Sequence, residues 1–162
     1  MELTQQTLKE LLEYDRETGL FRRRKAIARR SRVGELAGGV VFHGHIAIRV
    51  MGKRYLAHRL AWLYVYGYLP LEVDHINGKA DDNRISNLRE CTHAQNGKNR
   101  RKYKNNTSGR KGVTLLPNGK WRAVICCDGK FVHLGCFLTL EDAHSAYVDA
   151  AKRLHGEYAS FG

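Results

Sequence analysis

The sequence predicts an α+β fold in which short antiparallel strands and a few helices occupy separate blocks of the chain. From residue 38 to residue 56, apolar and polar residues alternate in short runs broken by glycine, as in β-ribbons. Residues 57–66 then keep apolar side chains at helical spacing and stop before Gly67. Residues 112–154 indicate three strands followed by one helix. No internal repeat is evident.

The charge of the chain points to a polyanionic partner. The chain has 162 residues, of which 28 are Lys or Arg and 16 are Asp or Glu, so its formal net charge is +12. The basic residues are spread over the whole length, which excludes a single basic tail as the source of the charge. Nucleic acid is the simplest partner for such a chain.

The cysteines and the hydropathy pattern predict a cytoplasmic, soluble protein. The four cysteines form no CxxC pair and have no zinc-ribbon spacing, so we expect reduced thiols and no structural zinc. The N-terminus is amphipathic and acidic at its second residue, unlike a signal peptide. No apolar run approaches the ~20 residues of a membrane span, so no membrane partner is expected.

The N-terminal segment predicts a short helix, a turn, a strand and a basic arm. Thr4 can cap a helix in which Leu8, Leu11 and Leu12 share a face, and a strand begins at residues 20–21. Residues 22–32 hold seven basic residues and no acid. They could form a solvated, mobile arm or an arm that follows phosphates, and the overall charge favours the second. The candidate phosphate contacts here are Arg22, Arg23 and Arg24.

The next block predicts a β-ribbon followed by a helix. Strands are expected at residues 40–42, 45–50 and 54–56, with a turn at His43–Gly44. Residues 57–66, AHRLAWLYVY, then predict a helix whose aromatic side chains lie in the core. His43 and His45 could suggest a metal site, but no acid accompanies them. We therefore expect both at the surface or in contact with backbone.

The C-terminal block predicts a three-stranded sheet covered by one helix. Strands are expected at residues 112–116, 121–127 and 130–137, with turns at residues 117–119 and 128–129. Thr139 can cap a helix whose alanine-rich face would lie close to the sheet, and Gly156 ends it. The open face of the sheet would carry Arg110, Lys111, Trp121, Arg122 and Lys130. A basic linker precedes this block, and a domain boundary is expected near Tyr103.

The central stretch, VDHINGKADDNRISNLRECTHAQN at residues 73–96, carries the chemistry. His75 is directly preceded by the carboxylate of Asp74. Phosphodiester hydrolysis needs a base that deprotonates water and a cation that neutralises the transition state and the leaving oxygen. An imidazole and one Mg²⁺ held by oxygen ligands can supply these functions. Neighbouring side chains on a strand point to opposite faces, so the pair requires a local bend, which Asn77–Gly78 would allow.

This stretch resembles the HNH endonuclease motif of the ββα-metal superfamily, in the form found in phage and intron homing endonucleases. The preceding RYLAHRLAWLYVYGYLP is similar to the lead-in of that group. The resemblance implies a hairpin followed by a helix that together grip one divalent cation. It implies that His75 is the general base, that Asp74 and Asn96 are metal ligands, and that Asn87 fixes the hairpin loop and orients His75. Such oxygen ligands suit Mg²⁺ or Mn²⁺ better than Zn²⁺.

Each of these residues also has a structural interpretation. Asp74 could be a turn acid, and Asn83 is expected to be a turn-forming residue that supports the site. His93 is expected to make a hydrogen bond at a helix start, with a catalytic or ligand role as the alternative. Arg59, Arg100, Arg101 and Lys102 are further candidate phosphate contacts. Arg84 and Arg89 are candidate phosphate clamps, for which surface charge is an alternative explanation.

The C-terminal block resembles an AP2 DNA-binding domain, on the residues SGRKGVTLLPNGKWRAVI and HLGCFLTLEDAHSAYVDAAKRLHGEYA. The resemblance implies a sheet that lies in the major groove of double-stranded DNA. The residues expected to contact DNA are Arg110, Lys111, Trp121 and Arg122.

Together these resemblances predict a ββα-metal unit preceded by a β-ribbon and followed by an AP2-like sheet and helix. The domains are expected at residues 1–52, 53–102 and 103–162. The expected function is a site-directed DNA endonuclease of homing type, in the host cytosol if phage-encoded. We expect a monomer that nicks, whereas cutting both strands would need a dimer or a second binding event. The alternatives are a non-catalytic DNA-binding or regulatory protein with an HNH scaffold, and an RNA-binding protein.

Overall fold

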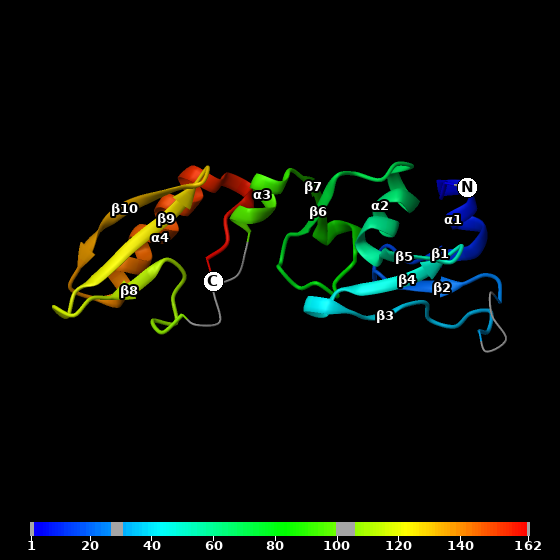
Figure 1. The fold of residues 1–162 in the computed structure, drawn as a ribbon, viewed down its shortest axis with the longest axis horizontal. Helices are drawn as coiled ribbons and strands as arrows, with labels where there is room; N and C mark the ends of the chain where they lie inside the picture. The colour runs from blue at the N-terminus through cyan, green and yellow to red at the C-terminus, as the bar shows by residue number, and fades with distance from the viewer. Residues whose placement is uncertain (1, 27–30, 100–105, 162) are drawn as a thin grey trace. The chain divides into compact units, whose positions relative to one another are not determined.

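The computed structural model describes residues 2–26, 31–99 and 106–161 (Figure 1). The chain divides into two compact units, Met1–Cys91 and Thr92–Gly162, and each is described by itself. The expected boundary near Tyr103 lies outside the described residues. The expected boundary between residues 52 and 53 lies inside the first unit.

The first unit begins with helix α1 (Gln5–Leu11) and the strand pair β1 (Leu12–Tyr14) and β2 (Phe21–Arg23). The Thr4 hydroxyl accepts a hydrogen bond from the Thr7 amide at 3.2 Å, which confirms the predicted cap. Leu12, expected in the helix, instead opens β1 and is the cross-strand partner of Arg23. The predicted basic arm is therefore wrong for Arg22 and Arg23, because both belong to β2.

A three-stranded antiparallel ribbon follows, made of β3 (Gly39–Val40), β4 (Ile46–Val50) and β5 (Lys53–Leu56). A 3₁₀ turn, η1 (Phe42–Gly44), joins β3 to β4. His43 has a φ of 60° and Gly44 a φ of 83°, which confirms the predicted turn. Ile48 and Val50 are buried and belong to the core of the unit.

Helix α2 (Ala57–Tyr66) agrees with the prediction at both ends. Gly67, with a φ of 87°, ends it by donating its amide hydrogen to the Leu63 carbonyl at 3.0 Å. Leu60 and Ala61 are completely buried and belong to one hydrophobic cluster that also contains Leu8, Phe21, Ile48, Val73 and Leu88. One core therefore joins the N-terminal segment, the ribbon, α2 and the hairpin described next.

The hairpin consists of β6 (Glu72–His75) and β7 (Leu88–Cys91), with a short 3₁₀ segment η2 (Ile85–Asn87) before β7. Asp74 pairs across the strands with Arg89, and His75 pairs with Leu88. The chain turns immediately afterwards, because the Gly78 amide donates to the His75 carbonyl at 2.8 Å and Gly78 has a φ of 66°. The bend therefore lies after His75 and not between Asp74 and His75.

The second unit begins with α3 (His93–Lys98), continues with β8 (Val113–Leu115), β9 (Trp121–Cys127) and β10 (Lys130–Phe137), and ends with α4 (Leu140–His155) and η3 (Gly156–Tyr158). The strand order is β10-β9-β8, and α4 lies along this sheet (Figure 1). Thr139 caps α4 by accepting from the Asp142 amide at 3.1 Å, as predicted. Buried Tyr147, Ala150 and Ala151 of α4 pack against Ile125 of β9.

Trp121 differs from its predicted position. Its side chain packs with Ala123 of β9 and Ala143 of α4, on the face that the helix covers. Alternation along the strand places Arg122 on the opposite face. The prediction that Trp121 lies on the open face is therefore wrong.

All four cysteines are free. In the described parts of the chain, no helix combines the length and the apolar character needed to cross a membrane.

Candidate functional site at the end of a hairpin

His75 is held in one tautomer by Asn83. The His75 Nε2 atom lies 3.2 Å from Asn83 Oδ1, and the Asn83 amide is oriented because its Nδ2 donates to the Asp81 carbonyl at 3.1 Å. An amide oxygen can only accept, so Nε2 carries the hydrogen and the lone pair lies on Nδ1. Asn83, which is 2% exposed, thereby does more than form a turn.

Asn87 closes the loop that connects the two strands. Its Oδ1 accepts from the Asn77 amide at 3.0 Å, while its Nδ2 donates to the Asp82 carbonyl at 2.8 Å. These bonds hold the loop against the start of β7, as the resemblance implies. The side-chain bond to the His75 ring that the structure shows comes from Asn83.

Asp74 is half of a buried ion pair. Its Oδ2 accepts from Arg89 Nη2 at 2.6 Å and from Arg89 Nε at 2.9 Å. The Asp74 side chain is 6% exposed and that of Arg89 12%. Because β6 stays regularly paired through His75, the side chains of Asp74 and His75 leave the strand on opposite faces.

His75 belongs to a cluster of three histidines within the first unit. Its ring centroid lies 4.9 Å from that of His58 on α2 and 5.6 Å from that of His45, which directly precedes β4. His45 is half-buried and has a hydrogen bond with the backbone of Ala80, so of its two expected environments the contact with backbone is the one found. Burial lowers the pKa of all three imidazoles, and that of His58 falls to about 3. His75 is therefore neutral at pH 7 and in the form of a base.

Acid is expected to destabilise the first unit through His58. Its pKa is about 3 in the folded chain and has its ordinary value of 6.5 when unfolded, and His45, His75 and Arg59 disfavour its charged form. Above pH 6.5 neither state is protonated. Between pH 6.5 and 3 the unfolded state binds the extra proton, so stability falls by up to about 1.4 kcal/mol per pH unit. Thermal unfolding at pH 7 and pH 5 measures this loss.

The matched control is His58→Gln, which removes the titrating group and should show a smaller loss between the two pH values. An equal loss in both proteins would contradict the assignment of this acid sensitivity to His58.

Asn96 and His93 lie on α3, in the second unit. A capping box begins this helix: Thr92 Oγ1 accepts from the Gln95 amide at 3.3 Å, and Gln95 Oε1 accepts from the Thr92 amide at 2.8 Å. His93 therefore occupies the first position of a well-capped helix. The expected role of Asn96 as a metal ligand beside Asp74 stays a prediction.

Several predicted phosphate contacts in the first unit make intramolecular bonds. Arg59 Nη2 donates to the Pro70 carbonyl at 2.9 Å and so ties α2 to the segment before β6. Arg84 forms an ion pair with Asp82 at 2.7 Å, and Arg22 donates to the Gly34 carbonyl at 3.0 Å. Arg24 is exposed. The predicted contacts Arg100, Arg101 and Lys102 lie outside the described residues.

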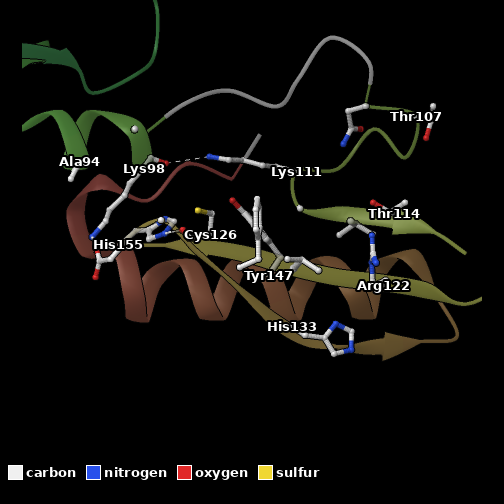
Figure 2. A pocket seen from close by; sticks show the side chains of 18 of the residues that line it. Ala94, Lys98, Thr107, Lys111, Thr114, Arg122, Cys126, His133, Tyr147 and His155 are labelled. Carbon is white, nitrogen blue, oxygen red and sulfur yellow. Dashed lines mark hydrogen bonds and ion pairs between the residues drawn. The ribbon is translucent and has the colours of Figure 1, made fainter.

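The second unit has a hollow of about 1270 Å³ beside the sheet face that α4 does not cover (Figure 2). Residues of α3 and of all three strands line it, including Lys98, Lys111, Arg122 and His133. Lys111 Nζ donates to the Lys98 carbonyl at 3.3 Å, and burial lowers the pKa of Lys111 to about 8. Arg110 and Arg122 are exposed, so they are better placed than Lys111 to contact a large partner.

Comparison with known proteins supports the resemblance of the central stretch to HNH endonucleases. A family model described as HNH endonuclease matches residues 55–98. An uncharacterized HNH endonuclease of Acanthamoeba polyphaga mimivirus is 31% identical over 112 residues, which are 68% of this chain and 58% of that protein. Protein 3.8 of Escherichia phage T7 is 31% identical over 108 residues, which are 64% of this chain and 88% of that protein. No solved structure matches the chain.

Proposed function

Since the chain belongs to the HNH endonuclease family, we propose that it is a metal-dependent DNA endonuclease of homing type that hydrolyses phosphodiester bonds beside the hairpin β6–β7. The observation that carries the proposal is His75 itself. Its imidazole is buried, is kept neutral by that burial, and is bonded at Nε2 to an oriented amide. These are the properties of a general base that works near pH 7.

His75 would accept a proton from water at Nδ1. The tautomer set by Asn83 leaves the lone pair on that nitrogen, and Nε2–H keeps its bond to Asn83 Oδ1 when the ring becomes an imidazolium. The bond therefore supports both protonation states during the step. Asn87 has the separate task of holding the loop that ends beside this ring.

Asp74 and Asn96 would hold one divalent cation, Mg²⁺ or Mn²⁺, which when bound neutralises charge on the phosphate and on the leaving oxygen. A carboxylate and an amide supply the hard oxygen ligands that these ions prefer. Asp74 already accepts hydrogen bonds from Arg89. A carboxylate has enough lone pairs to accept these bonds and to bind a cation at the same time. Before the cation arrives, Arg89 would balance the charge of this buried carboxylate.

The second unit would anchor the enzyme to double-stranded DNA, with Arg110 and Arg122 as exposed contacts. If six phosphates are neutralised, the log–log slope of affinity against salt should be about −5. Replacing both arginines with glutamine should reduce that slope by about 2, because each phosphate contact contributes about 1. Fluorescence anisotropy of labelled DNA across a salt series measures both slopes.

Lys152→Gln serves as the control, because Lys152 is an exposed cation on α4 and lies outside the proposed contact face. A salt response that is flat in the wild-type chain would contradict the proposed anchoring.

The experiment that tests the proposed function is mapping of cut ends on a genome-scale DNA library treated with the full chain and Mg²⁺. A homing-type enzyme yields ends at a few positions. Because each chain would have one active site, at His75, a monomer should leave nicks. Paired ends would indicate two cooperating protomers.

A non-catalytic DNA-binding protein is the second candidate, and the ion pair on Asp74 is the observation that favours it. A scaffold that never binds a cation would have its buried carboxylate neutralised by an arginine, as here. Such a protein would leave no ends above the background of untreated DNA.

A further inference from the structure

Three imidazoles from three separate elements meet inside the first unit. His45 precedes β4, His58 lies on α2 and His75 ends β6, and one ligand nitrogen of each lies within 4.8 Å of the others. No carboxylate belongs to this group. A set of imidazoles alone favours a borderline transition metal over Mg²⁺, which prefers oxygen.

Two of the three rings are oriented by oxygen atoms outside the cluster. His75 Nε2 is hydrogen-bonded to Asn83 Oδ1. His45 has a hydrogen bond with the backbone of Ala80, and this bond favours the protonated form of the His45 ring. His45 Nδ1 has no hydrogen-bond partner among the described residues, so the bond to Ala80 is made by Nε2–H and the lone pair lies on Nδ1. Histidines that bind metals are typically oriented in this way, with the other nitrogen bonded to an oxygen.

The cluster also contains buried polar atoms that have no hydrogen-bond partner among the described residues. His58 is 5% exposed, and in the described parts of the chain its Nδ1 has no hydrogen-bond partner. A buried polar nitrogen without a partner costs free energy that an apolar side chain would avoid.

We propose that His45, His58 and His75 form a second metal site, distinct from the oxygen site at Asp74, and that this site binds Zn²⁺. Zinc–nitrogen bonds of about 2.0–2.1 Å require the ligand nitrogens to lie roughly 3.4 Å apart in a tetrahedron, so the rings must close by about 1 Å. The half-buried position of His45 gives an ion access from solvent and leaves room for water as a fourth ligand.

Occupancy of the site inhibits cleavage. This consequence depends on the proposed function, since it assumes that His75 is the general base. A His75 lone pair that is donated to Zn²⁺ cannot accept a proton from water. The chain would therefore be active with Mg²⁺ and inhibited by Zn²⁺, because both cleavage and zinc binding need the lone pair of His75.

Zinc binding by the full chain, measured by competition with a chromophoric chelator, tests the site itself. Wild type, His43→Gln and Asp74→Asn should bind one Zn²⁺ with similar affinity, whereas His45→Gln should bind at least about tenfold more weakly. His43 is an exposed histidine two residues away and is the matched control. Circular dichroism establishes that each variant is folded.

The pattern among the variants decides the proposal. If His45→Gln binds Zn²⁺ as tightly as wild type, or if Asp74→Asn weakens binding as much as His45→Gln does, the three-histidine site is wrong. Substitution with Co²⁺ adds a spectroscopic test, in which the expected spectrum is that of a tetrahedral site with nitrogen and oxygen ligands. A thiolate charge-transfer band would assign the metal to the cysteines and overturn the proposal.

The inhibitory consequence is tested by plasmid nicking in Mg²⁺ with and without an equimolar amount of Zn²⁺. Zn²⁺ should lower the nicking rate of wild type and of His43→Gln by at least about tenfold. For His45→Gln, the ratio of the rate without Zn²⁺ to the rate with Zn²⁺ should be smaller. Equal ratios in all three would overturn the inhibition. Absence of nicking in every arm would instead contradict the proposed function, while the binding experiment still decides whether the site exists.

Discussion

Replacing His75 with alanine is expected to lower the rate of plasmid nicking by at least about a hundredfold, which is the scale of general-base catalysis. His75 is the histidine whose burial, tautomer and position at the hairpin end suit it to deprotonate water. Affinity for DNA should change little, because His75 is 5% exposed and the proposed anchoring lies in the second unit. Nicking rates and anisotropy on the same preparations separate the two effects.

His43→Ala is the control for this experiment. His43 belongs to the same unit but lies exposed in the turn between β3 and β4, so its removal should leave the rate unchanged. Nicking by His75→Ala at the rate of wild type would show that another group activates the water.

Replacing Arg89 with leucine is expected to lower the free energy of unfolding of the first unit by about 3 kcal/mol, because it removes the guanidinium that faces a buried carboxylate. The ion pair with Asp74 joins two side chains that are 6% and 12% exposed. Urea unfolding followed by Trp62 fluorescence reports on this unit, and Trp121→Phe in the background removes the signal of the second unit.

Arg84→Leu is the matched comparison, since Arg84 forms an ion pair with Asp82 at 2.7 Å but its side chain is 48% exposed. Pairs of this exposed kind contribute less than about 1 kcal/mol. The double variant Asp74→Asn/Arg89→Leu should be more stable than Arg89→Leu alone, because it removes the buried charge as well. If Arg89→Leu and Arg84→Leu lower the free energy of unfolding equally, the claim that burial makes the Asp74–Arg89 pair the more important one is wrong.

Elements with strong local signals could be predicted from the sequence. Helix α2, strands β9 and β10 and the caps at Thr4 and Thr139 agree with the prediction, because periodicity, an Asp-Gly turn and short polar side chains act within a few residues. Leu12 shows where such signals fail. It fits the helical pattern of α1, but its pairing with Arg23 places it in a strand.

The candidate site was only partly accessible from the sequence for the same reason. Asp74 and His75 are neighbours in the chain, so their chemistry is visible in the motif. Arg89 becomes a partner of Asp74 only through the register of the hairpin, in which the two residues face each other across the strands. His45 and His58 reach His75 through packing of the ribbon and α2, for which no local pattern exists.

The same limit applies to the faces of the second sheet. Alternation in β9 predicts that Trp121 and Arg122 point to opposite faces, but not which of them α4 covers. The helix packs against Ala123 and Ile125, whose small or apolar side chains allow close approach, and Trp121 shares their face.

Conversion of supercoiled plasmid to open circles by the purified full chain, with Mg²⁺ and with a chelator, tests the central claim most directly. A nuclease that uses His75 and one divalent cation should convert the plasmid with Mg²⁺ and leave it supercoiled in the chelator. Supercoiled plasmid in both conditions, at protein concentrations at which the DNA is bound, would contradict the claim and assign the chain to DNA binding alone.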